Sequence, residues 1–352
     1  MKKLFASLMA MLCGFVGCKA QNTSYESVDV EDFVLALAKP EVVVLDVRTA
    51  QEYAAGHLPY AINIDVNQNT FEQKALKTLP KDYTIALYCR SGRRSKKAAE
   101  ILAKQGYRVV ELSTGFIGWE QARKPVTKEE VDLFFTPKGT RIYLFSIKHG
   151  SVKMRIGDRW IYVDPVTEAT PPTTNYADMP KADFILVTHS HYDHLDAVAV
   201  EQLWKEETVV VANGESASKL TGKTLVMKNG QSLKLAGGIE VKAVPAYNNS
   251  EEKQQFHPKG RDNGYVLTVE GFSIYVAGDT EDIPELAKLK HIDVAFLPCN
   301  LPYTMTPQQL LNAAKAFSPK VLFPYHYGNT DMKEVVTLFN DTKIDVRIRQ
   351  YQ

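Results

Sequence analysis

The segment from His189 to His194 concentrates side chains that bind metal ions. Three of the chain's eight histidines lie in it, together with Asp193, and it follows the apolar run Phe184–Val187. Imidazole and carboxylate are the ligands that zinc and similar divalent metals prefer. Histidines clustered at the end of a buried strand would be costly without an ion to bind. The sequence therefore predicts a divalent metal site at the carboxyl end of this strand.

A second reactive segment begins at Cys89, between an apolar strand pattern and a helix pattern. A thiol at a helix N-terminus is surrounded by backbone N–H groups, and nearby arginines add positive charge. Both effects favour the thiolate, which is the nucleophilic form of cysteine. The segment predicts a nucleophilic cysteine in an anion-binding loop. The other members of this loop are Arg90, Ser91, Gly92, Arg93, Arg94 and Ser95.

The overall composition is that of a globular protein. The 352 residues suit roughly two domains. The 42 lysines and arginines nearly balance the 41 aspartates and glutamates, so there is no basic excess to bind nucleic acid. Four cysteines, at positions 13, 18, 89 and 299, are too few for a disulfide framework. Each cysteine therefore needs its own explanation.

Residues 28–124 alternate between strand and helix patterns. Val42–Leu45 is a β-branched run, typical of a buried parallel strand. The expected strands are 42–45, 61–64, 84–88 and 108–112, and the expected helices are 30–39 and 94–105. This order predicts an α/β domain with a mainly parallel sheet flanked by helices, and it places Cys89 between a strand and a helix.

Residues 136–352 are richer in strands. The expected strands are 141–147, 152–156, 160–163, 184–188, 209–212, 239–247, 265–269, 273–277, 293–297 and 320–325. Helix patterns cover 308–316 and 331–339. About ten strands with few helices predict two packed sheets with helices outside.

The first domain resembles a single-domain rhodanese. The resemblance rests on Leu45-Asp46-Val47-Arg48 with Glu52, on residues 56–64, on the Cys-x-x-Gly-x-Arg-Ser form of residues 89–95, and on Gly115-Phe116 with Trp119. Rhodaneses carry the outer sulfur of a donor as a cysteine persulfide and pass it to a thiophilic acceptor. The resemblance implies that Cys89 is the nucleophile, that the backbone of residues 90–94 holds the persulfide, and that Arg94 is the cradle arginine. The loop is shorter than the Cys-x5-Arg loop of phosphatases, which favours sulfur chemistry.

The second domain resembles the metallo-β-lactamase superfamily, with its lactonase-like and phosphodiesterase-like branch as the nearest. The resemblance rests on the His-x-His-x-Asp-His form of residues 189–194, with support from Asp164-Pro165, residues 277–280 and residues 323–326. It implies an αββα sandwich and a metal-dependent hydrolase. The implied ligands are His189 and His191 for one metal, Asp193, His194 and His326 for a second, and Asp279 as the catalytic bridge. Zinc is the expected metal, as one or two ions, with iron and manganese as alternatives.

One ligand of the superfamily pattern is missing. Where a histidine usually follows Pro-Ala, this chain has Tyr247. Tyr247, or His257 from the next loop, is then a substitute ligand or a substrate contact. His149 either lines the site or serves packing. Two other interpretations stay open for this domain: an iron-dependent persulfide dioxygenase, and a metal-stabilised scaffold without turnover.

The N-terminus has the pattern of a secretory signal, with Lys2 and Lys3 before an apolar run. Phe15-Val16-Gly17-Cys18 resembles a bacterial lipobox, which implies that Cys18 carries lipid. The alternative is cleavage after Ala20. Both alternatives predict a mature chain outside the cytoplasm, and in the first the chain contacts a membrane only through the lipid anchor.

These patterns predict five divisions of the chain. They are a signal peptide at 1–18, a tether at 19–27, the rhodanese-like domain at 28–124, a linker at 125–135 and the metallo-β-lactamase-like domain at 136–352. The expected partners are a small-molecule sulfur donor, a sulfur acceptor and an unidentified small-molecule substrate of the metal domain.

Overall fold

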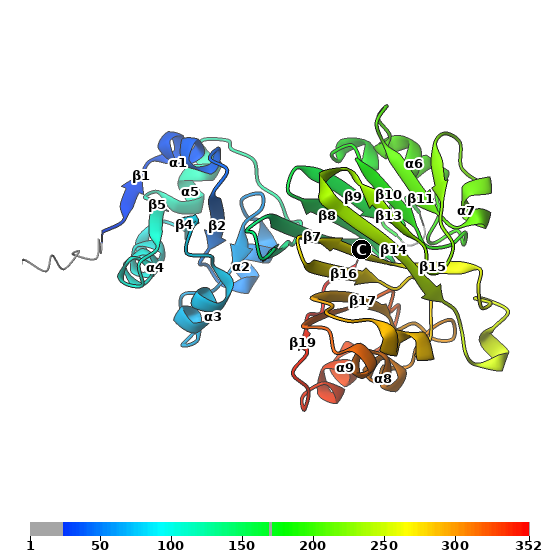
Figure 1. Cartoon of the computed structure of the whole chain (residues 1–352). Helices are drawn as coiled ribbons and strands as arrows, with labels where there is room; N and C mark the ends of the chain where they lie inside the picture. The colour runs from blue at the N-terminus through cyan, green and yellow to red at the C-terminus, as the bar shows by residue number, and fades with distance from the viewer. Residues whose placement is uncertain (1–23, 169–170, 352) are drawn as a thin grey trace, which may run out of the picture. The chain divides into compact units, whose positions relative to one another are not determined.

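The computed structural model describes residues 24–168 and 171–351 (Figure 1). The chain forms two compact units, with the division between Lys128 and Glu129. The expected signal peptide, Cys18 and most of the expected tether lie outside the described residues. Among the residues that are described, no helix is both long enough and apolar enough to cross a membrane.

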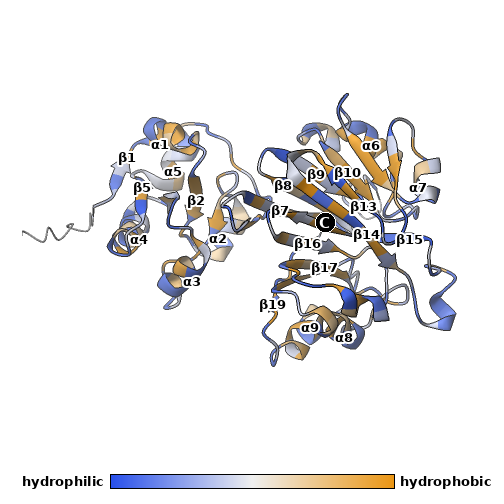
Figure 2. Cartoon of the chain, viewed as in Figure 1, coloured by the Kyte–Doolittle hydropathy of each residue, from blue (hydrophilic) through white to orange (hydrophobic). Residues whose placement is uncertain are grey.

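The first unit is built on a five-stranded parallel sheet in the order β1-β5-β4-β2-β3. The strands are β1 (Glu26–Val28), β2 (Val42–Asp46), β3 (Ile62–Asn63), β4 (Thr84–Tyr88) and β5 (Arg108–Leu112). The runs of β2 and β4 are largely buried, as expected for strands covered on both faces (Figure 2). The predicted α/β fold of this unit is confirmed.

Five helices accompany this sheet. They are α1 (Val30–Leu37), α2 (Ala50–Ala55), α3 (Phe71–Thr78), α4 (Arg93–Lys104) and α5 (Gly115–Gln121). Side-chain caps fix where the first two begin: Asp29 accepts from the Asp32 N–H, and Thr49 and Glu52 form a capping box. Phe33, Tyr88 and Trp119 belong to the buried core beneath the helices.

The second unit is a sandwich of two seven-stranded sheets. One sheet runs in sequence order through β6 (Asp132–Phe135), β7 (Arg141–Lys148), β8 (Ser151–Ile156), β9 (Arg159–Val163), β10 (Phe184–Val187), β11 (Val209–Ala212) and β12 (Thr224–Val226). The other runs through β13 (Ser232–Leu235), β14 (Ile239–Ala246), β15 (Asp262–Val269), β16 (Phe272–Val276), β17 (Val294–Pro298), β18 (Val321–Tyr325) and β19 (Asp345–Val346).

Buried side chains from both sheets form the central core, which includes Met154, Leu186 and Phe296. Helices cover the outer faces: α6 (Ala197–Leu203) packs over the first sheet, and α8 (Pro307–Phe317) and α9 (Met332–Leu338) pack over the second. The short helix α7 (Gly214–Ser218) follows β11. The predicted αββα sandwich is confirmed.

Several short elements differ from the expectations. β1 begins within the expected tether, and β6 lies within the expected linker. Thr127 of the same segment exchanges two backbone hydrogen bonds with His57, each of 2.8 Å, so this part of it belongs to the first unit. Short or polar strands such as β12, β13 and β19 lack the apolar run on which strand prediction depends.

The loops that carry the expected metal ligands share one edge of the sandwich. β9, β10 and β11 are parallel neighbours, as are β16, β17 and β18. Asp164 and His189 follow β9 and β10, while Asp279 and His326 follow β16 and β18. Carboxyl ends of parallel strands point the same way, so the topology gathers these residues.

Candidate functional site

The structure brings the histidines and aspartates of the second unit into adjoining clusters. Ligand atoms within 4.8 Å of one another define three groups: His149 with Asp193, His194 and His326; His189 with His191 and His257; and His189 with His194 and Asp279. These groups contain all six residues predicted to bind metal, and they add His149 and His257.

Asp279 lies between the two histidine groups. Its Oδ1 is 3.2 Å from His194 Nε2 and 3.5 Å from His326 Nε2. Its Oδ2 is 3.3 Å from His257 Nε2 and 4.0 Å from His189 Nε2. One carboxylate therefore faces both groups, which is the arrangement of a bridging ligand.

Several buried polar atoms in this cluster have no hydrogen-bond partner. They are Nε2 of His194, His257 and His326, together with Asp279 Oδ1. Buried polar atoms are nearly always paired, because an unpaired one costs the full free energy of desolvation. A divalent cation would satisfy them together, so the residues present fit a metal site.

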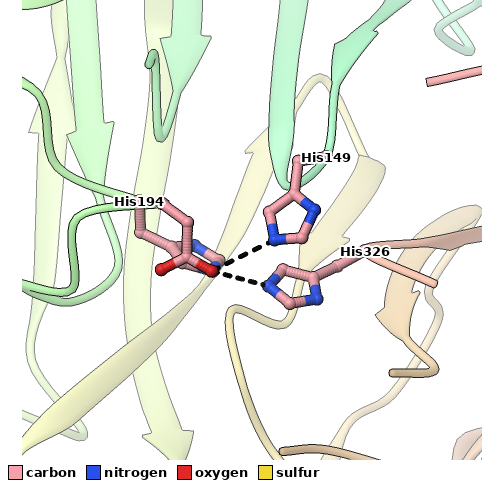
Figure 3. Close-up of side chains that lie close together, drawn as sticks. His149, His194 and His326 are labelled. Carbon is pink, nitrogen blue, oxygen red and sulfur yellow. Dashed lines mark hydrogen bonds and ion pairs between the residues drawn. The ribbon is translucent and has the colours of Figure 1, made fainter. Parts of the chain in front are cut away.

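His149 enters the cluster from the turn after β7. Its Nε2 lies 3.1 Å from Asp193 Oδ2, and His326 Nε2 lies 3.4 Å from the same oxygen. The rings of His149 and His326 lie close together, with centroids 3.7 Å apart (Figure 3). Of the two roles left open for His149, the geometry places it in the site.

A second layer orients the ligands. Asp164 Oδ2 is 2.8 Å from His194 Nδ1, and Asp164 also accepts from the Thr188 N–H and hydroxyl at 2.7 and 2.6 Å. Such carboxylate contacts fix which imidazole nitrogen is free to bind metal. His149, Asp164 and His326 have φ values of 46°, 46° and 47°, in a strained region for these residues.

Burial keeps His189 and His191 neutral. It lowers the pKa of His189 well below the usual value, and His194 adds to this effect. Burial, followed by the charge of His257, lowers the pKa of His191 to about 4. Neutral imidazole is the form that binds metal, so both side chains are ready to do so at neutral pH.

The carboxylates of the cluster are ionised. Burial opposes this, but His326 and His194 outweigh it and hold the pKa of Asp279 well below its usual value. Burial also opposes ionisation of Asp193, but the neighbouring His149 and His326 side chains lower its pKa. Burial would lower the pKa of His194, yet Asp279 and Asp164 raise it well above its usual value. The site thus concentrates negative charge that a cation would share.

The structure separates the roles of Tyr247 and His257. The Tyr247 hydroxyl donates to Glu285 Oε2 at 2.7 Å and lies 3.1 Å from Lys259 Nζ. His257 is buried and points its Nε2 at Asp279. The geometry therefore offers His257, rather than Tyr247, as the third side chain beside His189 and His191.

Gly150 leaves room for the ring of His194. A Cβ at position 150 would lie 2.8 Å from His194 Cε1 and 3.3 Å from its Nδ1. We expect Gly150→Ala to displace this ring from Asp164 and to weaken metal binding by about 10- to 100-fold, measured by titration calorimetry. Gly214→Ala is the control, because its nearest neighbour is 4.0 Å away. Equal affinity in both variants would contradict this packing argument.

In the first unit, Cys89 follows β4 and is 1% exposed. Ser95 Oγ lies 3.3 Å from its Sγ, and the Phe116 N–H donates to the Cys89 carbonyl at 2.8 Å. Gly92 precedes α4 with a φ of 91°, and a Cβ there would lie 2.1 Å from Ser113 O. The glycine of the loop is therefore required both by its conformation and by the close backbone approach.

The arginines of the loop differ in their contacts. Arg90 and Arg93 are exposed, as is Ser91. Both terminal nitrogens of Arg94 donate to Glu52, each at 2.7 Å. The Glu52 hydrogen bond raises the pKa of Arg94, and the charges of Glu52 and Cys89 add smaller effects in the same direction.

The Arg94–Glu52 pair makes stability depend on pH. The Arg94 hydrogen bond, against an opposing effect of burial, lowers the pKa of Glu52 from 4.5 to about 2. A carboxyl group whose pKa is lowered on folding stabilises the fold at pH values above its ordinary pKa. This stabilisation is lost as the pH falls toward the lowered pKa. We expect Glu52→Gln to lower the free energy of unfolding by up to about 1 kcal/mol above pH 4.5 and by almost nothing near pH 2. The loss is small because the pair is partly exposed.

Urea unfolding of the full chain at a series of pH values would measure this difference. Glu41→Gln removes an exposed carboxylate from the same unit and serves as the control. If Glu52→Gln lowers the free energy of unfolding by the same amount at pH 2, ionisation of Glu52 is not the cause of the stabilisation.

Comparisons with known proteins agree with both domains. The Rhodanese-like domain family matches residues 29–122, and the Beta-lactamase superfamily domain family matches residues 159–327. A UPF0173 metal-dependent hydrolase of Anoxybacillus flavithermus is 34% identical over 190 residues, which cover 51% of this chain and 83% of the relative. The chain belongs to this metal-dependent hydrolase family. A second member, from Bacillus cereus, is 35% identical with the same coverage.

Solved structures extend the comparison of this metal-dependent hydrolase. A Parabacteroides distasonis protein described as a metal-dependent hydrolase is 47% identical, with a TM-score of 0.61, and covers 64% of this chain and 100% of its own. A metallo hydrolase of Ignicoccus hospitalis is 25% identical, with a TM-score of 0.52, and covers 59% of this chain and 95% of its own. The rhodanese-like domain is thus joined to a metal-dependent hydrolase domain.

Sequence reasoning missed two residues of the hydrolase chain that the structure places at the sites. Arg261 Nη2 lies 3.5 Å from His191 Nε2, and no motif marked it. Glu111 accepts from Ser95 in the rhodanese-like domain. The available signal for Glu111 was its place inside the apolar strand β5, because glutamate is rarely buried unless its carboxylate has a partner.

Proposed function

We propose that the chain combines a zinc-dependent hydrolase with a persulfide-forming sulfurtransferase. The observation that carries the first half is the convergence of unpaired buried atoms from His194, His257, His326 and Asp279 on one centre. Family membership supports hydrolysis as the reaction class. The substrate is a small molecule that has yet to be identified.

Two sets of side chains would hold the metal. His189, His191 and His257 form one set, and Asp193, His194 and His326 the other, with Asp279 facing both. A bound divalent cation supplies a water of lowered pKa and polarises the bond to be cleaved. Asp164 holds His194 in orientation, and His149 holds Asp193.

Elemental analysis of the purified chain, followed by a screen of lactones and phosphodiesters, tests this half. We expect zinc and turnover of at least one substrate class. Iron together with oxygen consumption on glutathione persulfide would instead indicate a dioxygenase. Stoichiometric zinc without turnover of any substrate would indicate a scaffold.

The second half of the proposal assigns sulfur transfer to Cys89. The thiolate would attack the outer sulfur of a donor such as thiosulfate, so that an S–S bond forms on Cys89 and sulfite leaves. A thiophilic acceptor such as cyanide would then take the outer sulfur and release the thiolate. The support is the position of Cys89 at the start of α4, in a loop that turns at Gly92.

Incubation with thiosulfate tests the intermediate directly. We expect the intact mass to rise by one sulfur atom, and cyanide to reverse the change with release of thiocyanate. A chain that gains no sulfur and releases no thiocyanate would refute this half.

We also propose that the mature chain works outside the cytoplasm, with lipid on Cys18. The proposal rests on Lys2, Lys3 and the apolar run that ends at Gly17-Cys18. Mass spectrometry of the N-terminal peptide from cells should find lipid on Cys18, and Cys18→Ala should release the chain from membranes. A mature N-terminus at Gln21 would show ordinary signal cleavage instead.

A further inference from the structure

The rhodanese-like domain contains a buried acid that the proposed sulfur chemistry does not use. Glu111 lies in β5 between Val110 and Leu112 and is 0% exposed. A charged carboxylate in an apolar interior is costly unless a cation pairs with it. No ion pair of Glu111 occurs among the residues that the structure describes.

Two serine hydroxyls donate to this carboxylate. Ser95 Oγ is 2.6 Å from Oε1, and Ser27 Oγ is 2.6 Å from Oε2. Distances this short are typical of hydroxyl donation to a carboxylate. Glu111 is therefore held at both oxygens, and Ser95 connects it to the loop that carries Cys89.

Ser95 has several acceptors within reach but only one hydrogen to donate. Its Oγ lies 2.6 Å from Glu111 Oε1, 2.9 Å from Gly92 O and 3.3 Å from Cys89 Sγ. When the hydrogen points to the carboxylate, the Oγ lone pairs are free to accept the S–H of Cys89. The three side chains then form a hydrogen-bonded chain in which the thiol donates to the hydroxyl and the hydroxyl donates to the carboxylate.

We propose that Glu111 takes the thiol proton of Cys89 through Ser95. The S–H bond breaks as the proton moves to Ser95 Oγ, and the Oγ–H bond breaks as its proton moves to Glu111 Oε1. The products are a thiolate, a serine whose hydroxyl now donates to it, and a neutral carboxylic acid. No electrons are transferred, and the buried site keeps a single negative charge.

This placement of charge suits the site. Before proton transfer the negative charge lies on the Glu111 carboxylate, which has no cation beside it among the described contacts. After proton transfer it lies on Cys89, which stands before the N-terminus of α4 and near Arg94. A helix N-terminus and a guanidinium both stabilise an anion there.

Other titratable groups face this network. Burial raises the pKa of Tyr25, and the charges of Glu100 and Glu111 add to the effect, so this phenol lies near both carboxylates. On the side of Cys89, Arg94 is paired with Glu52 and is also influenced by Asp65. None of these side chains donates to Glu111 or Ser95 among the described contacts.

The inference rests on the proposed sulfurtransferase function, but its test does not need sulfur transfer. The ultraviolet absorbance of the thiolate, with Cys89→Ser as the blank, would follow ionisation in the full chain without any sulfur donor. We expect Glu111→Gln and Ser95→Ala each to move the midpoint of thiolate formation upward by about one pH unit or more. Glutamine still accepts from Ser95 but takes no proton.

Glu100→Gln is the matched control, because it removes an exposed carboxylate near Tyr25 that does not contact Ser95. This control should leave the midpoint in place or lower it slightly. A midpoint that is unchanged or lowered in Glu111→Gln would overturn the proposal, since it would show that Glu111 acts only as a repelling charge.

Infrared difference spectroscopy on the unaltered chain gives a second measurement that does not depend on how the variants fold. At a pH where the thiolate absorbs, the unaltered chain should also show the C=O band of a protonated carboxyl group, and Cys89→Ser should lack this band at the same pH. Thiolate formation without that band would equally overturn the proposal. Failure of sulfur transfer alone would refute the proposed function and leave this result intact.

Discussion

Replacement of Cys89 by serine should reduce sulfur transfer from thiosulfate to cyanide by at least about 1000-fold, because loss of a covalent nucleophile removes the reaction path itself. The side chain is buried between β4 and α4, so the slightly smaller hydroxyl fits without rearrangement. The measurement is thiocyanate release under saturating thiosulfate. The same variant should show no mass increase on incubation with the donor.

Cys299 provides a matched control. It is the other free cysteine among the described residues, and it is also buried, but it lies in the second unit. Burial raises the pKa of Cys299 to about 12, which keeps it a thiol. Cys299→Ser should retain sulfur transfer. Full activity in Cys89→Ser would refute the assignment of the nucleophile.

Replacement of Asp279 by asparagine should cost at least about 100-fold in metal affinity and abolish hydrolysis, since changes that only reorient ligands already cost 10- to 100-fold. Asparagine keeps the shape of the side chain but removes the charge that faces His194 and His257. Added zinc should raise the thermal unfolding midpoint of the unaltered chain and leave that of Asp279→Asn almost unchanged, because only bound metal stabilises the native state.

Asp183 serves as the control for Asp279. It is a buried aspartate that precedes β10, at the end of the strand opposite His189, and it pairs with Lys205. Asp183→Asn should lower stability while metal content is preserved. Equal zinc content in Asp279→Asn and the unaltered chain would contradict the bridging role.

Much of the fold follows from local patterns. The strand at 84–88 and the strand at 209–212 were predicted to the residue, because each is a compact apolar run with clear boundaries. The extended β15 begins at Asp262, three residues before the apolar pattern starts at Tyr265. Its first residues pair with β14 through backbone hydrogen bonds, which place no demand on side-chain type.

The sequence by itself determined the chemistry that belongs to contiguous segments. The spacing of His189, His191 and His194 predicts a metal-binding strand end, and Cys89 before a loop that turns at Gly92 predicts a nucleophile. Both conclusions depend only on neighbours along the chain, so they need no knowledge of distant contacts.

Tertiary structure alone decided which distant residues complete each site. His257 and His149 join the metal cluster from separate loops, and Glu111 reaches Ser95 from the adjacent strand. Their positions depend on how strands pair and sheets pack, and a single histidine or glutamate has no local signature of such contacts. The physical reason is that burial and proximity arise from packing between elements, whereas spacing along the chain constrains only side chains within one element.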